Sequence, residues 1–213
     1  MQIKTWLQRL TDESNSWFSG VKAEDDGDFL AAASNYVEDS TRCLEQNLVR
    51  SALSCTCAAN CLMQLGAQTH ARKLYSLAAR IYLDNSGVAM SESIRETLWS
   101  MQEALENFVL AGERKEAEIV RAKYVALSAR TNPFGRTSIT VPTIEEQKSP
   151  LLPASPINST QAELPKSLLN QIDRLIKSHQ KLLVPADKFD PGYVLRSIYS
   201  EGGSRLSEKS IAS

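Results

Sequence analysis

The chain has 213 residues, of which 42% are hydrophobic and 23% charged, and its formal net charge is −1. This composition is that of a globular protein, and a net charge so close to zero provides no overall field for attracting nucleic acid or an acidic membrane. No segment approaches the ~20 consecutive apolar residues of a membrane-spanning helix, and the first ten residues lack the features of a signal peptide. We therefore expect a cytoplasmic protein with no nucleic-acid partner and no membrane insertion.

The first 132 residues contain no proline and show helical spacing of apolar residues throughout, which predicts an all-α fold. An amphipathic helix is expected over 3–10. Ser93, with Glu96 three residues later, has the pattern of a capping box at the start of a helix. Steps of three and four residues mark two longer runs: Leu48, Ala52, Cys55, Ala59, Leu62, and Ile94, Leu98, Met101, Leu105, Phe108.

Three glycines, Gly27, Gly66 and Gly112, each end one helical pattern and precede another, as glycines do between antiparallel helices. An alanine follows each glycine by five residues, and a tyrosine follows the first two by nine. Small residues at these positions allow close helix contact, and the aromatic ring fills the gap towards the next pair. The residues in this repeat are Ala32, Ala71, Ala117, Tyr36 and Tyr75.

The chain changes character at Pro133, because all eight prolines lie at or after it. Proline, serine and threonine between residues 132 and 163 predict a flexible linker. Apolar spacing then predicts an amphipathic helix over 164–185, which we expect to dock on the preceding helices, although a tethered partner-binding segment is the alternative. The remaining residues, 186–213, have the composition of a largely disordered tail.

The repeat resembles tetratricopeptide-like (TPR-like) helical repeats in the segments GDFLAAASNY, LMQLGAQTHARKLYSLA and FVLAGERKEAEIVRAKY. The glycines are 39 and 46 residues apart instead of ~34, so the repeats more closely resemble the irregular, long ones of soluble NSF attachment proteins. Asp39 stands where a small residue is expected, and Arg121 where an aromatic one is. The resemblance implies a short stack of antiparallel helix hairpins over 1–131 with a separate C-terminal helix. An ordinary helical bundle with coincidental spacing is the alternative.

The resemblance also implies that the first helix of each hairpin lines a binding face. The predicted face is apolar and weakly acidic, and its positions contain no lysine or arginine. Exposed tryptophan and methionine favour recognition of a peptide or helix. The predicted partner-binding residues are Trp17, Val21, Thr56, Asn60, Met63, Trp99, Gln102 and Glu106.

Four cysteines offer a different function, that of a metal or redox protein using Cys43, Cys55, Cys57 and Cys61. On one helix Cys57 and Cys61 are neighbours, but Cys55 points about 200° away from Cys57, so the three cannot meet at one ion. We therefore predict packing roles for the cysteines, with no metal site and no cofactor. Only two histidines occur, and no catalytic motif is recognisable, so we predict no enzymatic activity.

These observations predict a scaffold or adaptor that binds a peptide or helix of another protein without performing chemistry. The alternatives are the cysteine-based metal or redox protein and a regulatory or structural subunit of a larger assembly.

Overall fold

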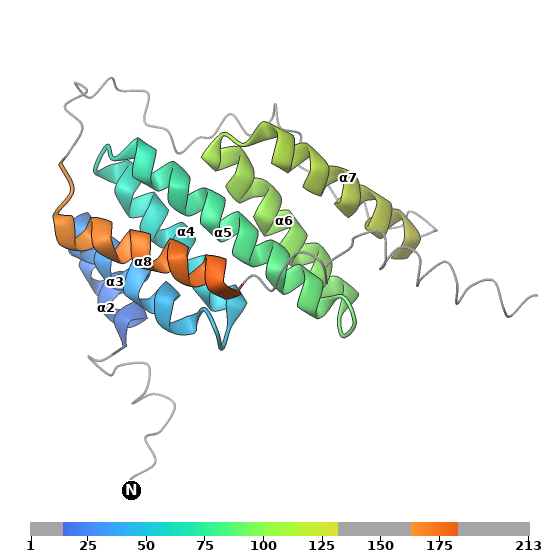
Figure 1. Cartoon of the computed structure of the whole chain (residues 1–213), viewed down its shortest axis with the longest axis horizontal. Coiled ribbons are helices and arrows are strands. Elements are labelled where there is room, and N and C mark those ends of the chain that lie inside the picture. The colour runs from blue at the N-terminus through green and yellow to red at the C-terminus, as the bar shows by residue number, and fades with distance from the viewer. Residues whose placement is uncertain (1–14, 132–162, 183–213) are drawn as a thin grey trace, which may run out of the picture. The chain divides into compact units, whose positions relative to one another are not determined.

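The computed structural model describes residues 15–131 and 163–182, and every regular element in these two ranges is an α-helix. The all-α class predicted from the apolar spacing is thereby confirmed. Consecutive helices from α2 to α7 pack against each other in antiparallel fashion (Figure 1). The helix expected over 3–10 lies outside the described residues. The helices are α2 (Ser16–Asp25), α3 (Phe29–Cys43), α4 (Leu48–Gln64), α5 (Gln68–Ala89), α6 (Ile94–Ala111), α7 (Arg114–Thr131) and α8 (Lys166–Leu182).

The three glycines form the turns within the hairpins α2–α3, α4–α5 and α6–α7, as the repeat predicts. Gly27, Gly66 and Gly112 have φ angles of 77°, 74° and 84°, in the left-handed region that side chains disfavour. The amide after each glycine donates to the carbonyl five residues earlier, for example Asp28 N to Ala23 O at 2.8 Å. This is the hydrogen bond of a Schellman motif, which satisfies carbonyls at the helix end and reverses the chain.

Side chains also fix where helices begin. Asn15, Asp28, Asn47 and Ser93 each accept a hydrogen bond from a backbone amide in the first turn of α2, α3, α4 and α6. The predicted cap at Ser93 is confirmed, because its Oγ accepts from Glu96 N at 3.2 Å.

Small residues bring the two helices of each hairpin close together. The three repeated alanines, Ala32, Ala71 and Ala117, are completely buried, and the tyrosines Tyr36 and Tyr75 are buried as well. In the third hairpin, where Arg121 replaces the expected aromatic residue, the buried aromatic ring is that of Tyr124, one turn later along α7. In all three hairpins, therefore, the two helices approach each other closely at an alanine, and a buried aromatic ring fills the space beside it.

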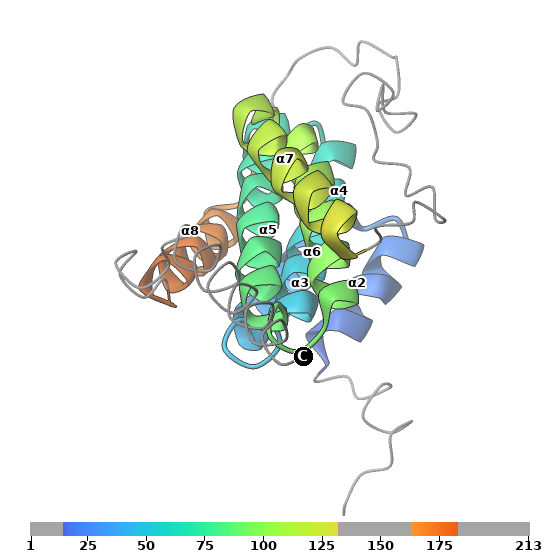
Figure 2. The ribbon, with the colours of Figure 1, turned by 90° about the vertical axis from the view of Figure 1, so that its right-hand side faces the viewer.

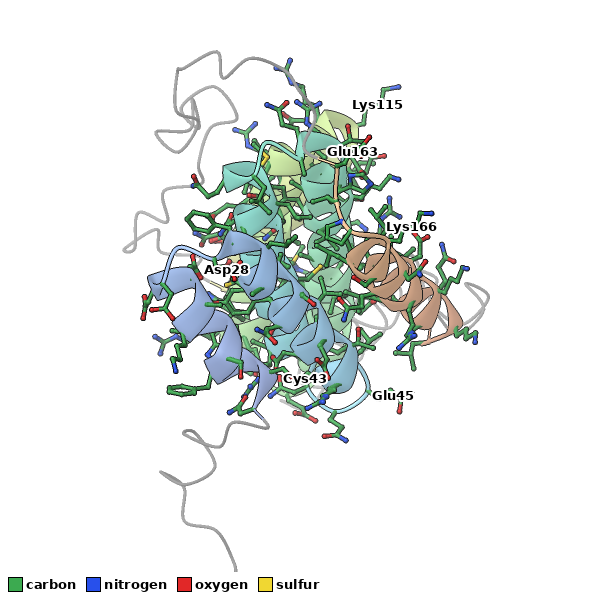
Figure 3. All side chains as sticks on the ribbon, turned by 90° about the vertical axis from the view of Figure 1, so that its left-hand side faces the viewer. Asp28, Cys43, Glu45, Lys115, Glu163 and Lys166 are labelled. Carbon is green, nitrogen blue, oxygen red and sulfur yellow. The ribbon has the colours of Figure 1, made fainter. Side chains whose placement is uncertain are left out.

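The last helix, α8, packs beside α3 and α5, which are the second helices of the first two hairpins. The described part of α8 up to Ser178 belongs to the same compact unit as the hairpins. Its Leu168, Ile172 and Leu175 are buried in the same core as the hairpins. Ser34 Oγ on α3 donates to Gln171 Oε1 at 2.9 Å. Figure 2 shows α8 beside α3 and α5, and Figure 3 shows α2 and α8 on opposite sides of α3.

The predicted helix over 164–185 corresponds to α8, whose last described residue is Leu182. The predicted linker over 132–163, apart from Glu163, and the predicted tail over 186–213 lie outside the described residues. Among the described helices, none is long and apolar enough to cross a membrane.

Candidate functional site

The first helices of the hairpins, α2, α4 and α6, are linked to each other by two sets of polar contacts. Arg50 on α4 donates from Nη2 to Oδ1 of Asn15, the N-cap of α2, at 3.1 Å, and its guanidinium lies 5.7 Å from the centre of the Trp17 ring. Thr56 Oγ1 on α4 donates to Asn107 Oδ1 on α6 at 2.9 Å. These contacts place α4 between α2 and α6, so that the eight predicted binding residues lie on three adjoining helices.

On α2, the predicted residues Trp17 and Val21 are half-buried and one helical turn apart. The Trp17 ring meets the Tyr36 ring edge-on, with 5.3 Å between the centroids and an interplanar angle of 60°. With Tyr36 on one side and the Arg50 guanidinium on another, Trp17 is held in one orientation. Trp17 therefore has a structural role in joining α2 to α3 and α4, and only part of its ring faces solvent.

Arg50 is a residue that the spacing pattern did not include, and it links the surface to a polar network around the buried Asp39. Its Nε and Nη2 atoms donate to the two carboxylate oxygens of Asp39 at 3.0 and 2.9 Å, and Ser54 Oγ donates to Asp39 Oδ2 at 2.6 Å. The hydrogen bonds to Asp39 raise the pKa of Arg50 above its usual value. Asp39 stands where the repeat predicts a small residue. The ion pair with Arg50 compensates for the burial of its carboxylate.

On α4, the predicted residues Thr56 and Met63 are half-buried and Asn60 is exposed. Asn60 Oδ1 accepts a hydrogen bond from the hydroxyl of Tyr75 on α5 at 2.6 Å, and this bond orients the Asn60 amide. Leu53, one turn before Thr56, keeps 42% of its surface exposed. This helix therefore presents apolar and amide groups side by side.

On α6, the predicted Trp99 is the most open of the aromatic residues on the face, with 41% of its surface exposed. Its ring stands at 89° to that of Tyr82, with 5.7 Å between the centroids, so the two rings pack in a T-shaped pair while Trp99 stays partly exposed. The predicted Gln102 and Glu106 follow along the helix and are half-buried, and Gln102 Nε2 donates to Glu106 Oε1 at 3.3 Å.

Glu103 is a second residue that the spacing pattern did not include. Burial raises the pKa of its carboxyl, and the charge of Glu106 raises it further. Both causes act against the ionised form of Glu103.

We name Trp17, Val21, Leu53, Thr56, Asn60, Met63, Trp99, Gln102, Glu103 and Glu106 the first-helix face. Arg50 links α4 to α2, and Asn107 links α6 to α4. Neither residue is among those that the repeat predicts for the binding face. The residues predicted from the spacing lie on α2, α4 and α6. The spacing does not identify the two cross-links, because these depend on how far neighbouring helices are shifted along each other.

The four cysteines do not form a common site. Cys55 is buried and its Sγ contacts Leu74 O of α5 at 3.2 Å, whereas Cys43 Sγ contacts Asp39 Oδ2 at 3.9 Å. Burial, followed by the charge of Glu24, raises the pKa of Cys57 to about 11 and that of Cys61 to about 12. Such thiols remain protonated at neutral pH and are poor metal ligands and nucleophiles. Within residues 15–131 and 163–182, no three His, Cys, Asp or Glu side chains are grouped to hold a metal ion.

Comparison of the chain with models of known protein families, with curated proteins and with solved structures finds no match.

Proposed function

We propose that this chain is a non-catalytic scaffold or adaptor, built from TPR-like helical repeats, which binds a peptide or helix of a partner protein on the first-helix face. The observation that carries the proposal is Trp99, a large aromatic side chain that packs against the Tyr82 ring and is left 41% exposed. A rigid, partly exposed tryptophan is the kind of residue that contributes most to protein recognition, because binding buries a large area at little cost in side-chain entropy.

The neighbouring side chains support a protein partner. Leu53 is exposed on the adjoining helix, and Met63 supplies a side chain that adapts to varied apolar surfaces. Asn60 and Gln102 provide amides for hydrogen bonds to a peptide backbone. Because α8 packs beside α3 and α5, this helix does not occupy the first-helix face (Figure 2).

The charges of the face favour a partner segment that combines apolar residues with lysine or arginine. Glu103 and Glu106 lie close enough for the charge of Glu106 to raise the pKa of Glu103. The nearest cation identified on α4, Arg50, is already paired with both oxygens of Asp39. A partner cation placed at Glu103 and Glu106 would relieve their repulsion, so the face selects against acidic peptides.

The proposal includes a cytoplasmic location and no cofactor. It assigns the cysteines to packing, since the raised pKa values of Cys57 and Cys61 keep them as thiols at neutral pH.

The test compares two double variants with the wild-type chain as immobilised baits in extract from the source cells. Leu53→Ser with Trp99→Ser removes exposed apolar area from the first-helix face. Val88→Ser with Ile94→Ser removes exposed apolar area at the α5–α6 turn and is the matched control. All four residues are exposed, so neither variant should unfold the chain.

We expect a protein that the wild type and the control retain and that the Leu53/Trp99 variant loses. Calorimetric titration with the purified partner should then give similar affinities for the wild type and the control, and a lower affinity for the Leu53/Trp99 variant. The proposal is wrong if every retained protein binds the Leu53/Trp99 variant as well as the wild type, or if none is retained.

A further inference from the structure

α8 is joined to the hairpins by a longer stretch of chain than any other described helix. From α2 to α7, successive helices are two to four residues apart along the chain, whereas 34 residues, 132–165, separate α7 from α8. A segment of this length spans up to about 110 Å when fully extended. Because α2 to α7 also pack on one another in sequence, α8 can leave the hairpins without pulling any of these helices away from its neighbours.

The apolar contacts of α8 come from one side of the helix. Leu168, Ile172 and Leu175 are at most 2% exposed and belong to the same hydrophobic core as the hairpins. They occupy positions i, i+4 and i+7, which is the spacing of the anchors by which an amphipathic helix binds a protein surface. The opposite side of α8, with Asn170 and Arg174, is exposed. The surface under α8 is therefore built as a binding site for an amphipathic helix.

A hydrogen bond adds specificity to this packing. Gln171 lies three residues after Leu168, and its Oε1 accepts from Ser34 Oγ on α3 at 2.9 Å. Figure 2 shows α8 beside α3 and α5 at this position. Ser34 is half-buried, so covering its hydroxyl without providing an acceptor would cost a hydrogen bond. A helix bound here should therefore combine three aliphatic anchors with a polar acceptor at i+3.

We propose that the surface of α3 and α5 around Ser34, which we name the α8 site, is a second helix-binding site. α8 occupies it reversibly, and a helix of a partner protein displaces α8. This partner helix has leucine or isoleucine at i, i+4 and i+7 and a side-chain acceptor such as glutamine at i+3. The α8 site is separate from the first-helix face on α2, α4 and α6, so it does not depend on the partner proposed there.

The attachment makes α8 a built-in competitor for any partner at the α8 site. A tethered segment competes at an effective concentration that is millimolar for short connections and falls as the connection lengthens. A partner helix with the same affinity for the site as α8 therefore binds the intact chain more weakly than a chain whose α8 cannot dock. A partner that succeeds also exposes Leu168, Ile172 and Leu175 of the displaced α8.

The first experiment measures binding of a labelled synthetic peptide of residues 163–182 to the full chain by fluorescence anisotropy. The chain with Leu168→Ser, Ile172→Ser and Leu175→Ser cannot dock its own α8, so it should bind the peptide. The wild-type chain should bind the peptide about tenfold or more weakly, because its own α8 competes. Equal affinity of the two chains, or no binding to either, overturns the proposal.

Variants of the peptide show whether the anchors are responsible. A peptide in which Leu168, Ile172 and Leu175 are replaced with serine should not bind. The matched control carries Asn170→Ser and Arg174→Ser on the exposed side and should bind like the original peptide. If both altered peptides bind equally well, the apolar side of the helix does not determine recognition, and the proposal is wrong.

A second measurement keeps the native α8 and so does not depend on how well the serine chain folds. A protease site inserted after Lys148 allows the folded full chain to be cut between α7 and α8. The fragment that contains α8 should remain bound at high concentration and dissociate on dilution, while circular dichroism shows that the hairpins stay helical. A fragment that leaves only when the hairpins unfold contradicts reversible occupancy of the site.

A double-mutant cycle tests where the peptide binds. On the serine chain, Gln171→Ala in the peptide should weaken binding about fivefold, because the hydrogen bond from Ser34 is lost. When the chain also carries Ser34→Ala, the same change in the peptide should have little effect, since the bond is already missing. If Gln171→Ala weakens binding equally on both chains, the peptide does not lie against Ser34 and the α8 site is wrongly placed.

Discussion

Tyr36 lies against the backbone of Gly20, so that a methyl group on Gly20 would come within 2.8 Å of two atoms of the tyrosine ring. The ring cannot easily move away, because its hydroxyl donates to Glu24 Oε2 at 2.7 Å and its edge contacts Trp17. The glycine is thus required for the close packing of α2 on α3, and this packing positions Trp17 on the first-helix face.

Gly20→Ala should lower the free energy of unfolding by about 1–2 kcal/mol. Alanine gains ~1 kcal/mol over glycine in helix propensity, but overpacking against a fixed ring costs up to ~3 kcal/mol. Urea unfolding followed by circular dichroism measures the difference. In a Tyr36→Leu background the same substitution should be neutral or stabilising, since the ring is gone. A stabilising effect in the wild-type background would contradict the close contact.

Thr56→Val should lower the free energy of unfolding by about 1–3 kcal/mol. Asn107 is buried, and the substitution removes the hydroxyl that donates to its Oδ1 while nearly preserving side-chain volume. Thr56→Ser keeps the hydroxyl and is the matched control, with a smaller loss from the missing methyl group. If valine and serine variants unfold at the same urea concentration, the bond between α4 and α6 contributes nothing measurable.

Arg50→Ala should destabilise the chain by about 2–3 kcal/mol, because the buried Asp39 carboxylate then loses its cationic partner and keeps the Ser54 hydroxyl and the more distant Cys43 thiol as donors. The loss is smaller than for a fully buried pair, since Arg50 remains partly exposed. Adding Asp39→Asn removes the unpaired charge and should recover part of the stability. A double-mutant cycle by urea unfolding measures the coupling, and additive effects of the two substitutions would contradict it.

The thiols of Cys57 and Cys61 should make the free energy of unfolding fall as pH rises above about 9. Cys57 and Cys61 have pKa values of about 11 and about 12 in the fold, raised from 9.0. As pH rises, the unfolded chain therefore loses these thiol protons before the folded chain does. Deprotonation favours the unfolded state at pH values between 9.0 and the raised pKa values of the fold. Unfolding free energies at pH 7.5 and pH 10 should show this decrease. Cys57→Ala with Cys61→Ala should reduce the slope, and an unchanged slope would assign the effect to other groups.

Much of the fold could be predicted because local rules decide it. Gly27, Gly66 and Gly112 mark left-handed turns, and Ser93 caps α6, since each of these roles depends on a few adjacent residues. The capping box is only half formed, because the Glu96 carboxylate accepts instead from Asn85 Nδ2 at 3.3 Å. A contact with the preceding helix thus replaces the local partner that the pattern predicts.

The candidate site was predictable only at the level of helices. Trp99 and Asn60 follow from the repeat spacing, but Arg50 lies six residues before Thr56 and reaches α2 through its long side chain. Such a contact depends on the shift between neighbouring helices, which no local spacing encodes. For the same reason the sequence predicted an amphipathic C-terminal helix without predicting that it lies beside α3, to which the hydrogen bond from Ser34 to Gln171 joins it.

The final prediction concerns the apolar side of α8. Leu168, Ile172 and Leu175 are at most 2% exposed, and burying a side chain of this size contributes roughly 1.5–3 kcal/mol before ordering costs. Replacing all three with serine should therefore lower the free energy of unfolding by several kcal/mol and release α8, because a free helix of this length is marginal in water. Hydrogen exchange should then show loss of protection in α8 and in the part of α3 around Ser34. The control replaces Asn170, Arg174 and Lys177, on the exposed side of the same helix, with serine and should leave stability nearly unchanged. If both triple variants have the same stability and exchange pattern, α8 does not stabilise the hairpins, and a free, partner-binding α8 becomes the better account.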